Sequence, residues 1–430
     1  MRSPPVFGKN FRHPLQERTP GTVSSTRGGE TKFNDRQEHR LLLVSSEPIL
    51  NLGGVGMVVQ QLVQGLPDNC RVSLASPGAG RETLPARLNE RLAATFDLPP
   101  GKWTPAATQD FLAHVRAEDY DLINFHGGTF SFDGHLPWRS PLHALDATGV
   151  PWIFTNHCVP ALSAGLFPAN YPFYLKAPKF ALAYFSKARL LARCRREVMV
   201  SDENARRIAG WFPWAKRKLT TIYSARLEGE IPSATFRDPV ITIANLGHLA
   251  WRKGQADLLK AFCRLSGKFP QLQLLLAGPA LEPDCAEWIR SEVARTGLQD
   301  RVHLPGGLTD LREFWRQTDI YVQPSHYEGA PMALMEALWN SKPAVGTRVS
   351  GIPEIIDEEQ TGLLVDPRNT EALAEALERL IRDPDLRRRF GAAGPARISA
   401  KSMTGEKMVR RYADLYEDVL AKSPPRHRRP

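Results

Sequence analysis

The sequence has no long hydrophobic run. Its longest apolar stretches, such as residues 272–277, which Gln273 interrupts, fall far short of the roughly 20 residues that a transmembrane helix needs. The basic N-terminus likewise lacks the apolar core of a secretory signal. These two absences predict a cytoplasmic protein that does not span a membrane.

Cysteine is scarce as well. The chain has five cysteines, none of them in Cys-x-x-Cys spacing: Cys70, Cys158, Cys194, Cys263 and Cys285. This pattern argues against a disulfide framework and against a cysteine-rich zinc site, so we expect reduced thiols.

Composition and charge set the broad class. Of 430 residues, 42% are hydrophobic and 24% are charged, which is ordinary for globular proteins and excludes a chain that is disordered throughout. A chain of this length is expected to form two or three domains. The net charge of +10 favours anionic partners, but it does not distinguish nucleotides, lipids and nucleic acid.

Short apolar runs alternate with longer amphipathic stretches, which is typical of βα units in a parallel sheet. The predicted strands are 41–46, 72–76, 122–126, 152–155, 197–201, 241–247, 272–278, 302–304, 320–323, 344–346 and 362–365. Predicted helices in the second half are 255–265, 311–317, 331–339 and 371–382.

The alternation is interrupted at residues 224–239, where two prolines and several charges without periodicity indicate a linker. We therefore predict an α/β protein of two doubly wound, Rossmann-like domains that face each other across a cleft. The expected parts are a mobile tail at 1–40, domains at 41–223 and 240–400 around that linker, a helix at 401–421 that can return to the first domain, and a basic tail at 422–430.

The most specific motif follows strand 320–323. Pro331 is predicted at the first position of a helix, which leaves Glu328, Gly329 and Ala330 in the loop before it. Free N–H groups at a helix N-terminus favour anions such as phosphate. Glu328 and Glu336 border this loop, and ionised carboxylates accept hydrogen bonds from sugar and ribose hydroxyls.

A second motif contains Arg252 and Lys253 in a turn before a helix that opens near Gly254. Two adjacent cations beside a helix N-terminus are suited to neutralise a diphosphate. For Lys253 alone, a solvated surface lysine would be the plainer interpretation.

In the first half, Gly53 and Gly54 precede an amphipathic helix, an arrangement that a structural tight turn explains about as well as a ligand site does. His126 and His157 end two predicted strands. A lone histidine is more often a packed residue than a catalyst, but the position at strand ends favours a role in the cleft.

These motifs together resemble the retaining glycosyltransferases of family 4, which have the GT-B fold. Glu328, seven residues and then Glu336 resemble the family's E-x7-E signature, and Ser350 with Gly351 stands where the next block usually begins with two glycines. The turn before Gly254 is similar to the family's G-R-L-x3-K-G block, with His248 in place of the usual arginine.

The resemblance implies a role for each motif. It implies that Glu328 contacts the donor sugar, that Glu336 contacts the nucleotide ribose, and that His157, in a T-x-H block, is the histidine nearest the reacting sugar. The remaining residues that it assigns are Gly329, Ala330, Gly53 and Gly54 as donor-binding, His126 as an acceptor or cleft residue, and Arg252 and Lys253 as stabilisers of the leaving diphosphate.

The implied activity is transfer of a hexose from a nucleoside-diphosphate sugar to a hydroxyl of a glycan or lipid-linked acceptor, with retention at the anomeric carbon. The first domain would bind the acceptor and the second the donor. No cofactor and no essential metal are expected, since the Asp-x-Asp of Asp119 and Asp121 precedes a strand away from the GT-B site. The alternatives are another GT-B enzyme, such as a sugar-nucleotide epimerase or a phosphorylase, and an inactive anion-binding protein.

Residues 159–196 combine basic and aromatic side chains without any acidic one before Glu197. Such a stretch is suited to anionic lipid headgroups, and hence to peripheral attachment at the inner face of the membrane, or to the acceptor glycan. An aromatic core with a solvated basic face is the alternative. No nucleic-acid module is recognised, so nucleic acid is not an expected partner.

Overall fold

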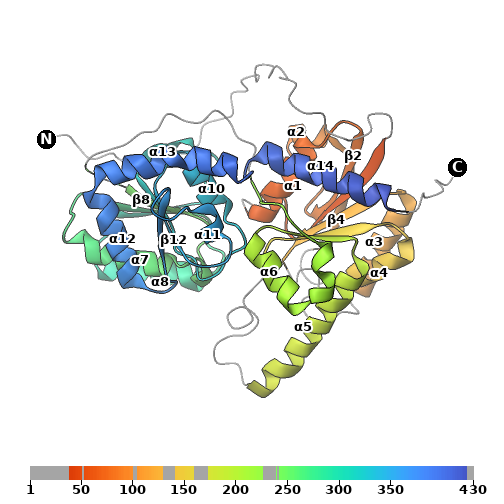
Figure 1. The fold of residues 1–430 in the computed structure, drawn as a ribbon, viewed down its shortest axis with the longest axis horizontal. Helices are drawn as coiled ribbons and strands as arrows, with labels where there is room; N and C mark the ends of the chain where they lie inside the picture. The colour runs from red at the N-terminus through yellow and green to blue at the C-terminus, as the bar shows by residue number, and fades with distance from the viewer. Residues whose placement is uncertain are drawn as a thin grey trace. The chain divides into compact units, whose positions relative to one another are not determined.

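The computed structural model describes residues 38–50, 53–99, 104–128, 141–158, 173–225, 239 and 242–423, and for residues 173–180 it describes the main chain alone. Most of the predicted tail at 1–40, most of the linker at 224–239 and most of the basic tail at 422–430 lie outside these residues. The described chain contains two parallel β-sheets, each covered by helices on both faces (Figure 1). The predicted class, two Rossmann-like α/β domains, is therefore confirmed.

The first sheet has seven strands in the order β3-β2-β1-β4-β5-β6-β7. They are β1 (His39–Ser45), β2 (Cys70–Pro77), β3 (Leu92–Leu98), β4 (Leu122–Gly127), β5 (Trp152–Asn156), β6 (Arg196–Met199) and β7 (Leu219–Thr221). The sequence patterns did not predict β3 and β7. Both are edge strands whose residues are mostly half-buried, so neither contains the continuous apolar run of a central parallel strand.

Helices cover this sheet on two faces. They are α1 (Gly54–Gly65), α2 (Ala86–Asn89), α3 (Pro105–Ala117), α4 (Pro141–Ala144), α5 (Phe173–Arg193) and α6 (Asp202–Trp211), with the 3₁₀-helices η1 (Leu145–Thr148) and η2 (Pro213–Lys218). At the start of α6, the Ser201 hydroxyl accepts a hydrogen bond from Asn204 N, and Asp202 and Glu203 occupy the first turn. This hydroxyl cap and these charges favour a helix N-terminus.

The second sheet has six strands in the order β10-β9-β8-β11-β12-β13. They are β8 (Thr242–Leu246), β9 (Gln273–Ala277), β10 (Val302–Gly306), β11 (Ile320–Gln323), β12 (Ala344–Thr347) and β13 (Gly362–Val365). Its helices are η3 (Trp251–Lys253), α7 (Gln255–Ser266), α8 (Pro283–Arg295), α9 (Arg312–Gln317), α10 (Met332–Trp339), α11 (Ile352–Ile355), α12 (Thr370–Arg382) and α13 (Pro384–Ala400).

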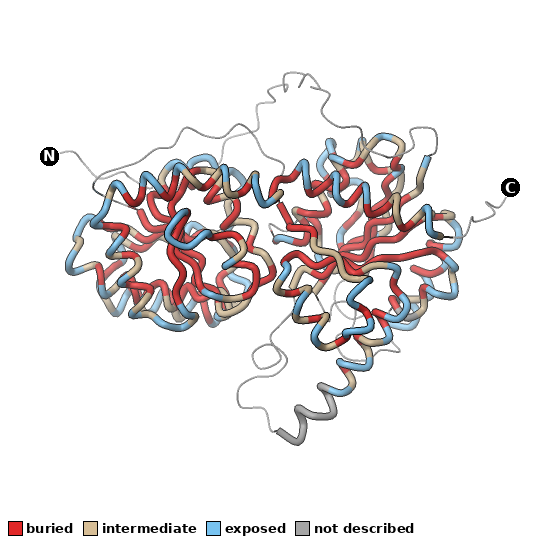
Figure 2. Tube along the Cα trace, in the orientation of Figure 1, coloured by how far each residue is buried: buried red, intermediate tan, exposed pale blue. Residues whose placement is uncertain are grey.

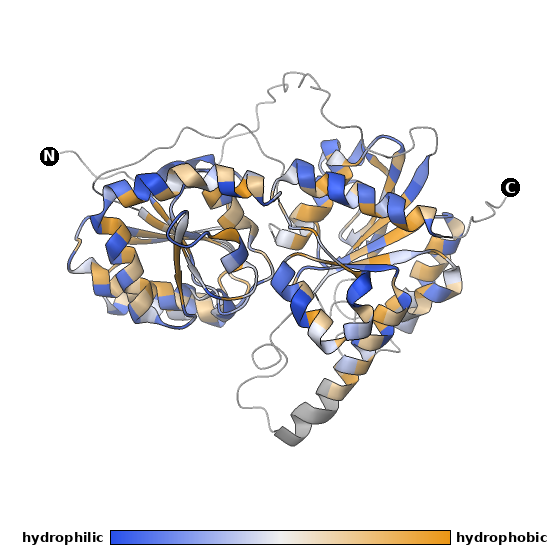
Figure 3. Ribbon diagram, viewed as in Figure 1, coloured by the Kyte–Doolittle hydropathy of each residue, from blue (hydrophilic) through white to orange (hydrophobic). Residues whose placement is uncertain are grey.

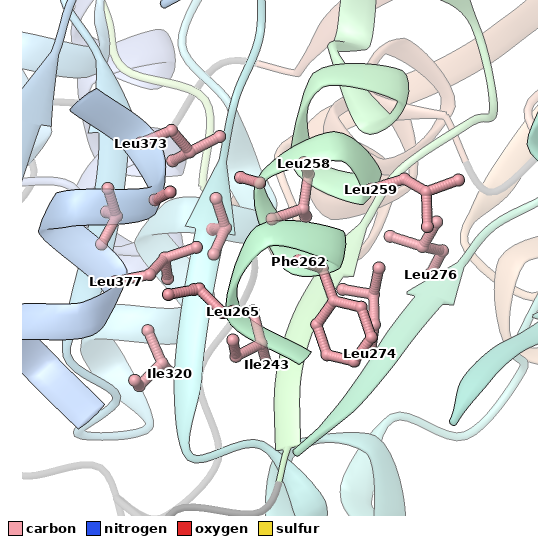
Figure 4. Close-up of a cluster of buried hydrophobic side chains, with 14 of the residues drawn as sticks. Ile243, Leu258, Leu259, Phe262, Leu265, Leu274, Leu276, Ile320, Leu373 and Leu377 are labelled. Carbon is pink, nitrogen blue, oxygen red and sulfur yellow. The ribbon is translucent and has the colours of Figure 1, made fainter. Parts of the chain in front are cut away.

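The core of the second domain shows why these helices form. In α7, apolar residues at helical spacing, among them Leu258, Phe262 and Leu265, face Leu274 of β9 and Leu377 of α12 (Figure 4). Replacing one of these leucines by alanine is expected to cost about 2–5 kcal/mol of stability.

Burial and hydropathy follow the same layers. The central strands are buried and apolar, whereas the outer faces of the helices are exposed and polar (Figures 2 and 3). Among the described helices, none combines the length and the apolar character needed to cross a lipid bilayer.

The last helix, α14 (Gly405–Ala421), packs against elements of the first sheet (Figure 1). A Cβ on Gly65 of α1 would lie 3.1 Å from Cγ2 of Val409, so the two helices are closely packed. Asn124 Nδ2 of β4 donates a hydrogen bond of 2.8 Å to the hydroxyl of Tyr416. Helix α14 therefore forms part of the core beneath β4.

Candidate active site

An ion pair between Lys253 and Glu328 joins the turn after β8 to the loop after β11. Gly254 follows Lys253 with a φ of 72°, a left-handed conformation that glycine adopts without strain. A Cβ at Gly254 would lie 1.9 Å from the carbonyl oxygen of Pro324, so only glycine lets the two segments approach. Lys253 Nζ then reaches Glu328 Oε1, which also accepts a hydrogen bond of 3.1 Å from Ser325 Oγ.

The carboxylate of Glu328 is buried yet ionised. The residue is only 6% exposed, and burial by itself raises the pKa of its carboxyl. The charges of Lys253 and Arg252, with hydrogen bonds from Lys253 and Ser325, outweigh burial and lower the pKa below its ordinary value. The site therefore contains a fixed negative charge with two cations beside it at neutral pH.

Arg252 lies on the same 3₁₀-turn as Lys253. Its guanidinium stacks over the ring of Tyr327, 5.7 Å from the centroid, and its carbonyl oxygen accepts a hydrogen bond of 2.8 Å from His326 N. Both predicted cations therefore contact the loop that precedes α10, Lys253 through Glu328 and Arg252 through Tyr327.

The start of α10 differs from the prediction by one residue. Pro331 has an extended ψ of 112° and stands outside the helix, which begins at Met332. Its carbonyl oxygen accepts a hydrogen bond from Leu334 N, which is the role of a helix N-cap and not of the first helical residue. The prediction of Pro331 as the first helical residue was wrong for this reason.

Glu336 lies in the second turn of α10 and is half-buried. Burial raises the pKa of Tyr321 in β11 well above its ordinary value, and the charges of Glu336 and Glu328 raise it further. The charges of the two predicted carboxylates therefore both influence the Tyr321 hydroxyl, although the carboxylates come from different segments.

Gly329 brings the loop between β11 and α10 against the first domain. A Cβ at Gly329 would lie 2.1 Å from the carbonyl oxygen of His157 and 2.9 Å from Cγ2 of Val200. The Gly329 carbonyl accepts a hydrogen bond of 3.0 Å from Gly351 N, and a Cβ on Gly351 would lie 3.3 Å from Ala330 Cα. Segments of both domains thus meet at Gly329, and Ala330 packs against Gly351 of its own domain.

His126 and His157 form a hydrogen-bonded pair. His126 is the last residue but one of β4 and lies beside Thr155 of β5, and its Nδ1 lies 3.2 Å from Nε2 of His157. Burial lowers the pKa of His157 to about 4, and burial together with His157 lowers that of His126 well below its ordinary value. Both imidazoles are therefore neutral at pH 7.

Gly53 and Gly54 lie where α1 begins. A Cβ on Gly53 would lie 3.5 Å from Cε1 of His248, and one on Gly54 would lie 3.8 Å from Sδ of Met332. These are ordinary contact distances, so the packing of the chain itself does not require glycine at either position. The turn adjoins the second domain at the start of α10.

The sequence patterns did not single out Glu47 in the loop after β1. One of its carboxylate oxygens would lie 3.4 Å from a Cβ on Gly53. Burial raises the pKa of Glu47, and the charge of Arg252 opposes the rise. Glu47 could have been found from its position just after a strand whose carboxyl end faces the site.

His248 lies beside the same turn. Burial and the cations Lys253 and Arg252 lower the pKa of His248, so its ring is neutral.

Glu354 of α11 was also missed. Its carboxylate accepts hydrogen bonds from the main-chain N–H groups of Asp202, at 2.9 Å, and Glu203, at 2.6 Å, and from the Tyr223 hydroxyl at 2.7 Å. It therefore caps the N-terminus of α6 from the other domain. No local sequence signal marks such a contact, because the partners are about 150 residues apart.

The basic and aromatic stretch is only partly described. Residues 159–172, and the side chains of 173–180, lie outside the described residues. Lys187 is 5% exposed and paired with Glu197, so this cation of the stretch does not belong to an exposed basic surface: the pair lets it be buried. Phe185, by contrast, is 67% exposed, and Trp214 of η2 is 57% exposed.

Comparison with known proteins identifies related chains. The family described as Glycosyltransferase Family 4 matches residues 52–225, and Glycosyl transferases group 1 matches residues 230–397. The alpha-maltose-1-phosphate synthase of Mycolicibacterium smegmatis is 38% identical over 42% of this chain and 48% of its own, so the match spans about half the length of that relative.

Two solved structures have a similar fold. Sucrose-phosphate synthase from Thermosynechococcus elongatus has a TM-score of 0.71 at 20% identity, over 90% of this chain and 100% of that one. Anabaena HepE, in complex with UDP and glucose, has a TM-score of 0.68 at 17% identity, over 87% and 99% of the two chains.

The two Rossmann-like domains, the E-x7-E loop and these structural likenesses define a protein of the GT-B fold. The two family matches together span most of the chain, and the chain belongs to the group 1 glycosyltransferases of the family 4 type, as the motifs predicted.

Proposed function

We propose that the protein is a retaining glycosyltransferase that transfers a hexose from a nucleoside-diphosphate sugar to a hydroxyl of a glycan or lipid-linked acceptor. The observation that carries the proposal is the ionised Glu328, which is paired with Lys253 beside Arg252 and precedes Gly329, whose main chain contacts that of His157. Family membership and the UDP and glucose bound by HepE support a nucleotide-sugar donor.

The proposed reaction is a displacement on one face of the sugar. The bond between the anomeric carbon and the diphosphate oxygen breaks, the acceptor oxygen bonds to the same face, and the acceptor proton leaves with the diphosphate. Lys253 and Arg252 stabilise the charge that develops on the leaving diphosphate, without an essential metal. Glu328 and Glu336 accept hydrogen bonds from the sugar and the ribose, and neutral His157 orients the sugar.

A donor panel tests this proposal. The protein would be incubated with UDP-, GDP- and ADP-sugars, with and without EDTA, while its thermal shift and the release of nucleoside diphosphate are measured. We expect one donor to shift the unfolding temperature and to release its diphosphate equally well with EDTA. Release only without EDTA would refute the metal-free mechanism, and an epimerised donor would indicate the epimerase alternative.

The Glu328→Gln variant tests the site. Because the amide carries no charge, we expect release of diphosphate to fall at least tenfold. Glu375→Gln, on the exposed face of α12, is the matched control and should keep wild-type activity. A fully active Glu328→Gln enzyme would remove the central site assignment.

For the acceptor side, we propose attachment to an anionic membrane surface. The exposed rings of Phe185 and Trp214 lie near the stacked pair Tyr184 and Phe212. The neighbouring Arg189 is also exposed, as are Lys216 and Arg217, two of the three cations of η2. Aromatic rings with nearby cations are suited to the headgroup region of anionic lipids.

Vesicle flotation tests this attachment. The full chain should float with vesicles that contain phosphatidylglycerol and not with pure phosphatidylcholine. The double variant Phe185→Ala and Trp214→Ala should lose most of this binding, whereas Leu281→Ala, which removes an exposed apolar residue of the second domain, should not. Equal flotation of the two variants would contradict the proposal.

A further inference from the structure

In the pair of His126 and His157, only one of the two ring nitrogens of His126 is hydrogen-bonded to a described side chain. His126 is 0% exposed, and its Nδ1 is 3.2 Å from Nε2 of His157. The other ring nitrogen of His126, Nε2, is buried and has no hydrogen-bond partner among the described residues. The hydrogen bond between the two rings can be donated by either His126 or His157, depending on their tautomers.

Two arrangements of protons are possible for two neutral imidazoles that share one hydrogen bond. If His157 donates from Nε2, the proton of His126 must sit on its Nε2, where a buried N–H would lack an acceptor. If His126 donates from Nδ1, its Nε2 carries only an unpaired lone pair. Buried donors without partners are rarer in proteins than acceptors with a free lone pair, so the second arrangement is favoured.

We propose that His126 is a positioning residue that holds His157 in the tautomer with its proton on Nδ1. His157 then accepts from His126 through Nε2 and keeps an Nδ1–H that can donate a hydrogen bond to an oxygen of the sugar. A donor of this kind stabilises negative charge at that oxygen without requiring a charged imidazole. This inference rests on the proposed function for its catalytic consequence, but not for the tautomer itself.

The surroundings of His126 keep its ring in place. Tyr412 of α14 packs beside it, with ring centroids 6.0 Å apart. The Tyr412 hydroxyl donates a 3.4 Å hydrogen bond to Thr155 Oγ1, and Thr155 donates in turn to Asn124 Oδ1 at 3.0 Å. The neighbouring polar groups are thus bonded to one another, and His157 is the partner that His126 has in this network.

Two variants separate the roles of the ring. In His126→Asn, the side-chain amide nitrogen can stand near the position of Nδ1 and donate to His157. In His126→Leu, the volume is similar but no donor remains. His114→Leu is the control for loss of an imidazole, because it removes a histidine of α3 whose Nε2 is hydrogen-bonded to the Tyr120 hydroxyl and not to the pair.

The tautomer is read directly from two-bond ¹H–¹⁵N spectra of the histidine rings of the full chain. We expect His157 to carry its proton on Nδ1 in the wild type and in His126→Asn, and to shift toward the Nε2–H form in His126→Leu. With the donor identified by the panel, kcat should fall about tenfold in His126→Leu, with little change in KM, and His126→Asn should recover most of it.

An Nε2–H form of His157 in the wild type overturns the proposal, as does a His126→Leu enzyme that matches His126→Asn in kcat. The wild-type spectrum decides the matter even if His126→Leu does not fold. If no donor is turned over, the proposed function fails, while the spectrum still tests the tautomer.

Discussion

The main chain of Gly329 lies so close to His157 that a Cβ there would come within 2.1 Å of the His157 carbonyl oxygen. The loop that carries Glu328 therefore contacts the end of β5 through main-chain atoms. Because the nearest atom is a main-chain oxygen, no side-chain rotation can make room for a Cβ at Gly329.

Gly329→Ala should consequently displace the loop. We expect a loss of about 1–3 kcal/mol in the free energy of unfolding, which is typical of overpacking, and a KM for the donor raised at least tenfold. Urea unfolding and initial rates measure the two effects. Gly210→Ala in α6 is the control, because nothing lies within 4 Å of the added Cβ and helix propensity favours alanine. Equal behaviour of the two variants would show that the close contact is not a constraint.

The pair of Lys253 and Glu328 predicts a dependence of stability on pH. A carboxyl whose pKa is lower in the folded state adds stability above its unfolded pKa, and this stability is lost as the pH falls through the folded value. For wild-type Glu328 this stability is therefore lost only at pH values below the ordinary pKa of a glutamate. In Lys253→Met, burial of Glu328 remains but the nearest cation is gone, so its pKa rises.

We therefore expect Lys253→Met to be less stable than the wild type by up to about 3 kcal/mol at pH 7, and the difference to shrink as the pH is lowered to 5. Unfolding temperatures at pH 5, 6 and 7 measure this. Lys260→Met, which removes an exposed lysine of α7, should show a difference that does not depend on pH. A constant difference for Lys253→Met as well would contradict the ionised buried pair.

Glu354 predicts a measurable link between α6 and α11. Glu354→Ala removes the acceptor for two main-chain N–H groups and the Tyr223 hydroxyl, so we expect the free energy of unfolding to fall by about 1–3 kcal/mol. Glu354→Gln keeps one acceptor oxygen and should lose less. Glu358→Gln breaks a half-exposed ion pair with Arg348 and is the control, with an expected effect below about 1 kcal/mol. Denaturant titrations that rank Glu358→Gln with Glu354→Ala would rule out the cap.

Ser350 precedes Gly351 in the loop after β12, and its φ of 49° is left-handed. Its hydroxyl accepts a 3.3 Å hydrogen bond from Glu328 N. Ser350→Gly relieves the backbone strain but removes this bond, so we expect a change in stability of less than about 1 kcal/mol. Ser350→Val neither relieves the backbone strain nor keeps the hydrogen bond, so it should be destabilised by at least about 1 kcal/mol. Thermal unfolding of both variants measures the contrast, and a stable Ser350→Val would contradict it.

Much of the fold could be predicted locally. Central parallel strands are buried on both faces, so β4 and β11 appear in the sequence as short apolar runs, and their bounds were predicted closely. The edge strands β3 and β7 lack such runs because solvent reaches them, and they were missed. The fold class nevertheless followed, because the alternation of strands and helices repeats along the whole chain.

The candidate site divides in the same way. The sequence by itself determined which residue types are available: the E-x7-E carboxylates, the adjacent Arg252 and Lys253, and histidines at the ends of two strands. Tertiary structure alone decided their pairing, because Lys253 meets Glu328 across 75 residues and His126 meets His157 across 31. It also decided that Lys187 is buried against Glu197, since only folding brings a compensating charge to a buried cation.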